Sequence, residues 1–292
     1  MTFYGVRGST PCGCDSNRRY GGNTSCVAVE ATGHAPFLFD MGTGLRFFGE
    51  TQPMDGSFRA NLFLSHLHWD HVQGLPFFVP VLKPGAAMTI YGPQPEDGRT
   101  LRETFDGLMS PPYFPVTVAD LPGDLRFEGV EEGWLDVDGA RVLARAVPHT
   151  GLTYGWRLEV NGMVIAYIPD HQQPQDGGFG IAPGVLELVS GADLLIHDAQ
   201  YTPEEFQRKS TWGHCTPAYA LEIARQGGVR TLALFHHDPA HDDEFLDELA
   251  ARESKRNHGL EVIVAAEGMR LQLRADAPPA APARRAAISP SA

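Results

Sequence analysis

The segment Ser65–His71 has the sequence SHLHWDH. It restricts the possible fold and chemistry of this 292-residue chain more than any other feature. It directly follows the apolar segment Asn61–Leu64. Within it lie four side chains that commonly bind metals, namely His66, His68, Asp70 and His71. Imidazole nitrogens and carboxylate oxygens suit zinc, and also iron and manganese. A strand that ends in a turn directs such side chains into one pocket, so we predict a metal site here rather than a solvated polar loop.

Three more candidate ligands also follow predicted strands. His149 follows Val142–Val147, Asp170 follows Val164–Ile168 and His236 follows Thr231–Phe235. A single histidine at such a position is more often structural, but together these residues complete a site for two metals, with Asp170 able to bridge them. His237 is an alternative to His236. We predict that His236 is the ligand because it immediately follows the strand, and that His237 supports the site or lies on the surface.

The remaining pattern predicts an α/β fold in which two sheets pack together with helices outside. Helices are expected at Arg99–Leu108, Ala218–Arg225 and Asp242–Lys255. The Pro- and Gly-rich segment Gly92–Gly139 has weak periodicity and is expected to be a long excursion near the active site. Residues 1–274 would form one domain, and the Pro/Ala-rich residues 275–292 a disordered tail. Strands are expected at Cys26–Glu30, Phe37–Asp40, Asn61–Ser65, Met88–Tyr91, Val142–Val147, Gly155–Glu159, Val164–Ile168, Leu194–His197, Thr231–Phe235 and Glu261–Ala265.

Composition restricts the partners and the compartment that we expect. The net charge is −13, which argues against a broad electrostatic contact with a nucleic-acid backbone. Four unevenly spaced cysteines do not resemble the disulfide framework of a small secreted protein, and no apolar run is long enough to span a membrane. We therefore expect a cytoplasmic protein that has no membrane partner.

The run His66–His71 resembles the H-x-H-x-D-H motif of the metallo-β-lactamase-like hydrolases, and the later candidate ligands follow in the order of that family. The resemblance implies a four-layer αββα sandwich of two mixed sheets. It also implies two divalent metals, foremost Zn²⁺, with Mn²⁺ or Fe²⁺ as alternatives. Asp40, in the segment DMGTG, would support the metal loop. The first metal would take His66, His68 and His149, the second Asp70, His71 and His236, and Asp170 would bridge them.

Two further segments resemble motifs of ribonuclease Z and related phosphodiesterases. These are Leu195–Gln200, which contains His197 and Asp198, and Gly213–Thr216, which contains His214. The resemblance implies catalytic roles for Asp70, His214 and Asp198: hydroxide generated at the metals attacks phosphorus while His214, oriented by Asp198, acts as general acid. In the alternative, Gly213 and His214 only open the helix that starts near Pro217. We expect His197 to be a buried strand-end residue, with a phosphate contact as its alternative.

The substrate expectation rests on spacing and charge. Ribonuclease Z carries a protruding arm for tRNA, whereas the spacings from His149 to Asp170 and on to His197 leave no room for one here. We therefore expect small phosphodiesters such as cyclic nucleotides, no extended nucleic acid, and a homodimer as a further possibility. The alternatives are a lactone or thioester hydrolase that uses the same metals, and a tRNA-processing nuclease. An iron oxidoreductase and a non-enzymatic metal-binding protein fit the ligand set less well.

Other residues carry weaker signals. Cys12 and Cys14 are interpreted as loop thiols rather than a structural zinc site. Arg7 and Asn23 lie in Gly-rich turns, which is favoured over a role in substrate contact. Four aromatic side chains could line the pocket and stack a base, although such residues are more often in the core: Trp69, Tyr113, Phe114 and Trp212.

Overall fold

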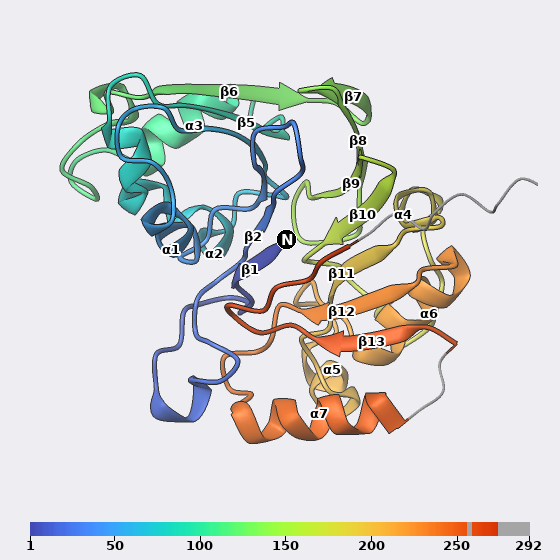
Figure 1. Cartoon of the computed structure of the whole chain (residues 1–292). Helices are drawn as coiled ribbons and strands as arrows, with labels where there is room; N and C mark the ends of the chain where they lie inside the picture. Colours follow the sequence, from blue (N-terminus) through green and yellow to red (C-terminus); the bar gives the residue numbers. More distant parts are fainter. Residues whose placement is uncertain (256–258, 274–292) are drawn as a thin grey trace, which may run out of the picture.

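The computed structural model describes residues 1–255 and 259–273, and within this range two β-sheets face each other with helices on their outer sides (Figure 1). The predicted four-layer sandwich of two mixed sheets is thus confirmed. The predicted tail at 275–292 lies outside the described residues.

The first sheet follows the order of the chain from β1 to β6. Strands β1, β2 and β3 pair antiparallel, whereas β3 to β6 pair parallel. Its strands are β1 (Thr2–Gly5), β2 (Cys26–Val29), β3 (Phe37–Phe39), β4 (Arg59–Phe63), β5 (Ala87–Pro93) and β6 (Asp124–Val130).

The second sheet also follows the chain, from β7 to β13. Here β7 to β10 pair antiparallel and β10 to β13 pair parallel. Its strands are β7 (Gly133–Val137), β8 (Ala140–Ala146), β9 (Tyr154–Val160), β10 (Met163–Ile168), β11 (Leu194–Asp198), β12 (Thr231–Phe235) and β13 (Glu261–Val264). Because parallel strands end at the same edge of a sheet, the loops after β10, β11 and β12 converge there.

Helices cover the outer face of each sheet (Figure 1). Those over the first sheet are α1 (Leu45–Glu50), α2 (Trp69–Val72) and α3 (Leu101–Leu108), joined by the 3₁₀ turns η2 (Leu75–Phe77) and η3 (Val79–Leu82). Those beside the second sheet are α4 (Pro183–Val189), α5 (Pro203–Lys209), α6 (Pro217–Gly227) and α7 (Asp243–Lys255). None of the helices in residues 1–255 and 259–273 is long and apolar enough to cross a membrane.

Local sequence explains where the helices begin. Thr216 caps α6 by accepting a hydrogen bond from the backbone N–H of Tyr219, and Pro217 occupies the first helical turn, where its missing N–H costs nothing. Thr100 and Glu103 form a reciprocal capping box at the start of α3. These caps fix α3 and α6 close to their predicted bounds.

Three apolar cores follow from the alternation of side chains along the strands. In β2, Val27 and Val29 face the core between the sheets, whereas Cys26 and Ala28 face the helices over the first sheet. A third core lies between the second sheet and helices α4, α6 and α7. The sandwich is therefore packed on both faces of each sheet.

The ten predicted strands and three predicted helices all occur, with small changes at their ends. The expectation of a long excursion at Gly92–Gly139 was incomplete, because this segment contains β6 and β7, which were not predicted, as well as the predicted helix α3. β6 and β7 are partly exposed and carry charged residues, which masks the apolar alternation of a strand. The segment does border the site, since Pro93–Asp97 line a cavity together with His66 and His68.

Two tryptophans of the second sheet allow a test of the core between the sheets. Trp156 on β9 is fully buried and donates a hydrogen bond to the carbonyl of Leu64 over 3.1 Å, at the end of β4. Trp134 on β7 is 42% exposed and lies against the guanidinium of Arg141. Trp156→Ala should lower the free energy of unfolding by about 3–5 kcal/mol, and Trp134→Ala by about 1 kcal/mol or less. Equal losses in urea unfolding would contradict this packing.

Candidate metal centre

All seven predicted metal ligands come together at one edge of the sandwich. His66 and His68 follow β4, and Asp70 and His71 lie in α2, so the first sheet contributes four of them. The second sheet contributes the other three, each from the end of a different strand. These are His149 after β8, Asp170 after β10 and His236 after β12.

The carboxylate of Asp170 lies at the centre of this group. Its Oδ1 is 3.1 Å from His71 Nε2 and 3.2 Å from His236 Nε2. Its Oδ2 is 3.5 Å from His149 Nε2 and 3.8 Å from His66 Nε2. One carboxylate oxygen therefore faces each of two groups of imidazoles, which is the arrangement that a bridging ligand requires.

The donor atoms fit divalent cations. They form overlapping groups in which all atoms lie within 4.8 Å of one another: His66, His68, His149 and Asp170; Asp70, His71 and His236; and Asp170, His214 and His236. His66 Nε2 and Asp170 Oδ1 are buried without a hydrogen-bond partner, although Oδ1 lies close to imidazole nitrogens. Buried polar atoms are rarely left unpaired, so such atoms among nitrogen and oxygen donors indicate a cation site.

Partner groups on the outer nitrogens orient the imidazoles. Asp40 Oδ2 lies 2.7 Å from His71 Nδ1, the carbonyl of Gly213 lies 2.7 Å from His149 Nδ1, and Gln200 Oε1 lies 3.0 Å from His236 Nδ1. Each contact leaves Nε2 directed into the cluster. Such partners fix the tautomer and ring orientation of metal-binding histidines. Gln200 and Gly213 were not predicted in this role, because only the fold brings them to the histidines.

The turns that carry the cluster are conformationally demanding. Asp40 and His236 adopt φ values of 57° and 59°, the left-handed region that non-glycine residues seldom occupy. Two glycines leave space for imidazole rings that a larger residue would displace. A Cβ on Gly8 would lie 2.3 Å from His236 Nδ1, and one on Gly213 would lie 2.5 Å from the ring of His149. The site therefore needs small residues at two positions distant in sequence.

Electrostatics in the cluster favour bound positive charge. Burial, followed by the charge of His71, holds the pKa of His66 well below its ordinary value, and a neutral imidazole is the form that binds metal. Burial opposes protonation of His71, but three nearby carboxylates, foremost that of Asp70, outweigh it and raise its pKa. Burial likewise opposes ionisation of Asp70, but the charge of His71 lowers its pKa. These carboxylates attract either a proton or a metal cation.

His214 and Asp198 form a pair beside the cluster. His214 Nδ1 lies 2.9 Å from Asp198 Oδ2, so aspartate reaches this histidine even though it is shorter than glutamate. Burial opposes protonation of His214, but Asp198 outweighs it and raises the pKa of the imidazole. Helix α6 begins only at Pro217, with Thr216 as its cap. The geometry makes His214 available as a proton donor.

The other candidate residues lie outside the cluster. His237 Nε2 pairs with the carbonyl of Ala265, and burial lowers the pKa of His237 to about 3. His197 is buried at the end of β11 against His171. Arg7 is buried among backbone carbonyls, and Asn23 contacts Glu267. Among the described residues, the groups able to hold a metal include neither Cys12 nor Cys14.

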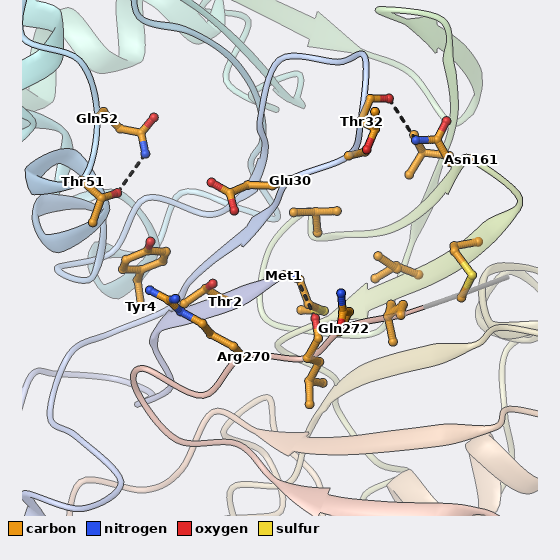
Figure 2. Close-up of a pocket in the computed structure, with 17 residues that line it drawn as sticks. Met1, Thr2, Tyr4, Glu30, Thr32, Thr51, Gln52, Asn161, Arg270 and Gln272 are labelled. Carbon is orange, nitrogen blue, oxygen red and sulfur yellow. Dashed lines mark hydrogen bonds between the residues drawn. The ribbon is translucent and has the colours of Figure 1, made fainter.

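The described part of the chain has several surface cavities. One of about 290 Å³ is lined by His66 and His68 and so leads to the cluster. A second, of about 840 Å³, is lined by Trp69 and Gln73. A third, of about 850 Å³, is lined by Met1, Glu30, Asn161, Arg270 and other residues, and includes none of the candidate ligands (Figure 2). Size alone therefore does not identify the reactive cavity.

Comparison with known proteins agrees with this arrangement. The family described as the beta-lactamase superfamily domain matches residues 37–237, more than half of the chain. The chain belongs to this superfamily. In fold it is similar to the metallo-beta-lactamase fold protein YhfI from Bacillus subtilis, with a TM-score of 0.68 and 19% identity over 92% of this chain and 96% of that one. The short form of human tRNase Z superposes with a TM-score of 0.60 and 24% identity, covering 92% and 96% of the two chains.

Proteins with similar sequences are named ribonuclease Z. The protein of Haloarcula marismortui is 26% identical, over 92% of this chain and 95% of that relative. The protein of Kineococcus radiotolerans is 28% identical, over 73% and 77%. The chain is therefore a superfamily hydrolase whose described ligand cluster can hold divalent metals.

These relatives contradict two expectations drawn from the sequence. The preference for small phosphodiesters such as cyclic nucleotides was wrong, and so was the exclusion of an extended nucleic acid as a partner. The physical error lay in using the net charge of the whole chain as a guide, since a substrate meets the local field of one cleft, where bound metals would dominate.

Asp40 provides a test of how the cluster is held. Its carboxylate accepts hydrogen bonds from Ser65 and Tyr167 in addition to its contact with His71. Asp40→Asn should weaken zinc binding by about 10- to 100-fold, because His71 loses its charged partner. Asp193→Asn is the matched control, since Asp193 caps the backbone of Val164 at the opposite end of β10. Competition with a chromogenic chelator measures both, and equal affinities in the two variants would contradict the role of Asp40.

Proposed function

We propose that this protein is a metal-dependent endonuclease of the ribonuclease Z type, which hydrolyses a phosphodiester bond in a tRNA precursor. The observation that carries the proposal is the His214–Asp198 pair beside the cluster of metal-binding side chains. The relatives named ribonuclease Z, which align over most of the chain, support the same substrate class.

The proposed ligands form two sets, one near each carboxylate oxygen of Asp170. His66, His68 and His149 would hold one cation, Asp70, His71 and His236 would hold the other, and Asp170 would contact both through its separate oxygens. Two divalent cations supply Lewis acidity, which polarises a phosphoryl oxygen and lowers the pKa of a water.

Departure of the leaving group requires a proton donor, and we propose that His214 supplies the proton. Asp198 occupies its Nδ1, so Nε2 remains to face the substrate. As water adds to phosphorus and the P–O bond breaks, Nε2 would give its proton to the leaving ribose oxygen, which yields an alcohol and a phosphate monoester. Although burial opposes protonation of His214, Asp198 raises its pKa, which favours the protonated form.

Asp198 is itself held in place, which makes it a positioning residue. Its Oδ2 accepts a hydrogen bond from the backbone N–H of His171, and its Oδ1 accepts one from the backbone N–H of Gln200. His171 directly follows Asp170, and the side chain of Gln200 contacts His236. The orientation of the proton donor is thus coupled to the segments that hold the metals.

Removal of the proton donor tests the mechanism. His214→Ala should leave the metal content unchanged and lower turnover of a tRNA precursor by roughly 10²-fold or more. His241→Ala is a matched control, because His241 also pairs with a carboxylate, that of Glu205, but lies outside the cluster. Metal analysis and single-turnover cleavage give both values. Loss of metal from His214→Ala would instead make His214 a ligand and contradict its role as general acid.

The substrate class needs its own test. Zinc- or manganese-loaded protein should cleave a tRNA precursor at its 3′ side and lose this activity when a chelator removes the metal. A lactone, a thioester and bis(p-nitrophenyl) phosphate serve as comparison substrates. Turnover of the lactone or thioester without precursor cleavage would overturn the proposed function while leaving the metal cluster intact.

A further inference from the structure

An exposed aromatic groove begins directly beside the metal cluster. It has a volume of about 840 Å³ and receives side chains from α1, α2, η2 and the loop after α3. Trp69 lines it and lies in the chain between His68 and Asp70, two members of the cluster. The groove therefore lies next to the segment that carries four of the candidate ligands, although none of these ligands lines it.

The side chains of the groove are unusually exposed for their type. Trp69 is 64% exposed, Tyr113 82% and Phe77 58%. Phe77 packs edge-on against Phe114, with 5.8 Å between ring centroids. Exposed aromatic groups on one concave surface mark a binding site more often than an accident of packing. Of the four aromatic side chains considered for base stacking, Trp69 and Tyr113 line the groove and are exposed. Phe114 lines it but is partly buried against a core, and Trp212 is exposed but does not line it. Phe77 adds a further exposed ring.

The chemistry of the groove favours bases over phosphates. Arg46 is the cationic residue among its lining side chains; it lies 3.5 Å from Glu50, and its guanidinium is 5.2 Å from the centroid of the Phe47 ring. Aromatic faces bind unpaired nucleotides by stacking, whatever the base, whereas a basic groove would hold the backbone.

We propose that this aromatic groove binds the unpaired nucleotides that adjoin the scissile phosphate, by stacking their bases on Trp69, Phe77 and Tyr113. The inference rests on the proposed function and gives its site a second part. The metal cluster would take the phosphate, and the groove would take the single-stranded segment next to it. The position of Trp69, between two candidate ligands in the chain and on the wall of the groove, favours this occupant over a protein partner.

The binding test uses the full chain, with a chelator present to prevent cleavage. The probe is a labelled single-stranded RNA of about eight nucleotides, compared with an abasic ribose-phosphate strand of equal length. Phe77→Ala combined with Tyr113→Ala should weaken RNA binding at least about tenfold. The abasic strand should bind weakly to both proteins. Trp134→Ala, an exposed aromatic change on β7, is the control and should bind like the wild type.

Cleavage assays separate this inference from the proposed function. If the wild type cleaves the precursor, the double variant should raise KM for a precursor with an unpaired trailer. If the wild type does not cleave the precursor, the proposed function fails. The inference about the groove is still supported if the wild type binds RNA better than the abasic strand and the double variant loses this difference.

Three results would overturn the inference. The first is equal RNA affinity of the double variant and the wild type. The second is equal binding of the abasic strand and the RNA, which would indicate backbone contact. The third is a change in oligomeric state of the double variant in sedimentation without a change in RNA affinity, which would make the groove a contact between copies of this chain.

Discussion

The contact of one buried carboxylate with histidines from both sheets governs the rest of this structure. Asp170 leaves the second sheet after β10, yet its oxygens face His66 and His71, which belong to the first sheet. A buried carboxylate without compensating charge would be strongly destabilising. Asp170 can therefore be buried at this edge of the sandwich only if positive charge lies next to its carboxylate. Imidazoles supply part of that charge, and the cations that the cluster can hold would supply the rest, so the requirement for folding and the requirement for chemistry coincide.

The same constraint explains the unusual backbone around the site. Asp40 and His236 adopt left-handed conformations directly after strands β3 and β12, and these turns bring their side chains into the cluster. Gly8 and Gly213 leave room for imidazole rings that a Cβ would displace. Each feature costs local stability, and the packed cores on both faces of the two sheets offset that cost. Strain is thus concentrated at the edge where the side chains must converge.

The sequence predicted ten of the thirteen described strands, and the side chains that gather at the site, because both depend on local signals. Four donors lie within six residues after an apolar strand, and each of the other three follows a strand of its own. The contacts of Gln200 with His236 and of Gly213 with His149 could not be predicted, since they join segments tens of residues apart. β6 and β7 were missed because charged residues interrupt their alternation. The exposure of Trp69 and Tyr113 likewise depends on how α2 and the loop after α3 are placed.

The expectation about substrate failed for a different physical reason. Net charge is a sum over the whole surface, whereas substrate binding depends on a single cleft, so an acidic chain can still act on RNA. The aromatic groove offers a means of binding that needs little positive charge.

The most direct test of the central claim is anomalous diffraction from crystals of the zinc-loaded protein. The account predicts two anomalous peaks, one beside His66, His68 and His149 and one beside Asp70, His71 and His236, with Asp170 in contact with both. No peak at this edge of the sandwich, or a single peak that Asp170 does not contact, would contradict it.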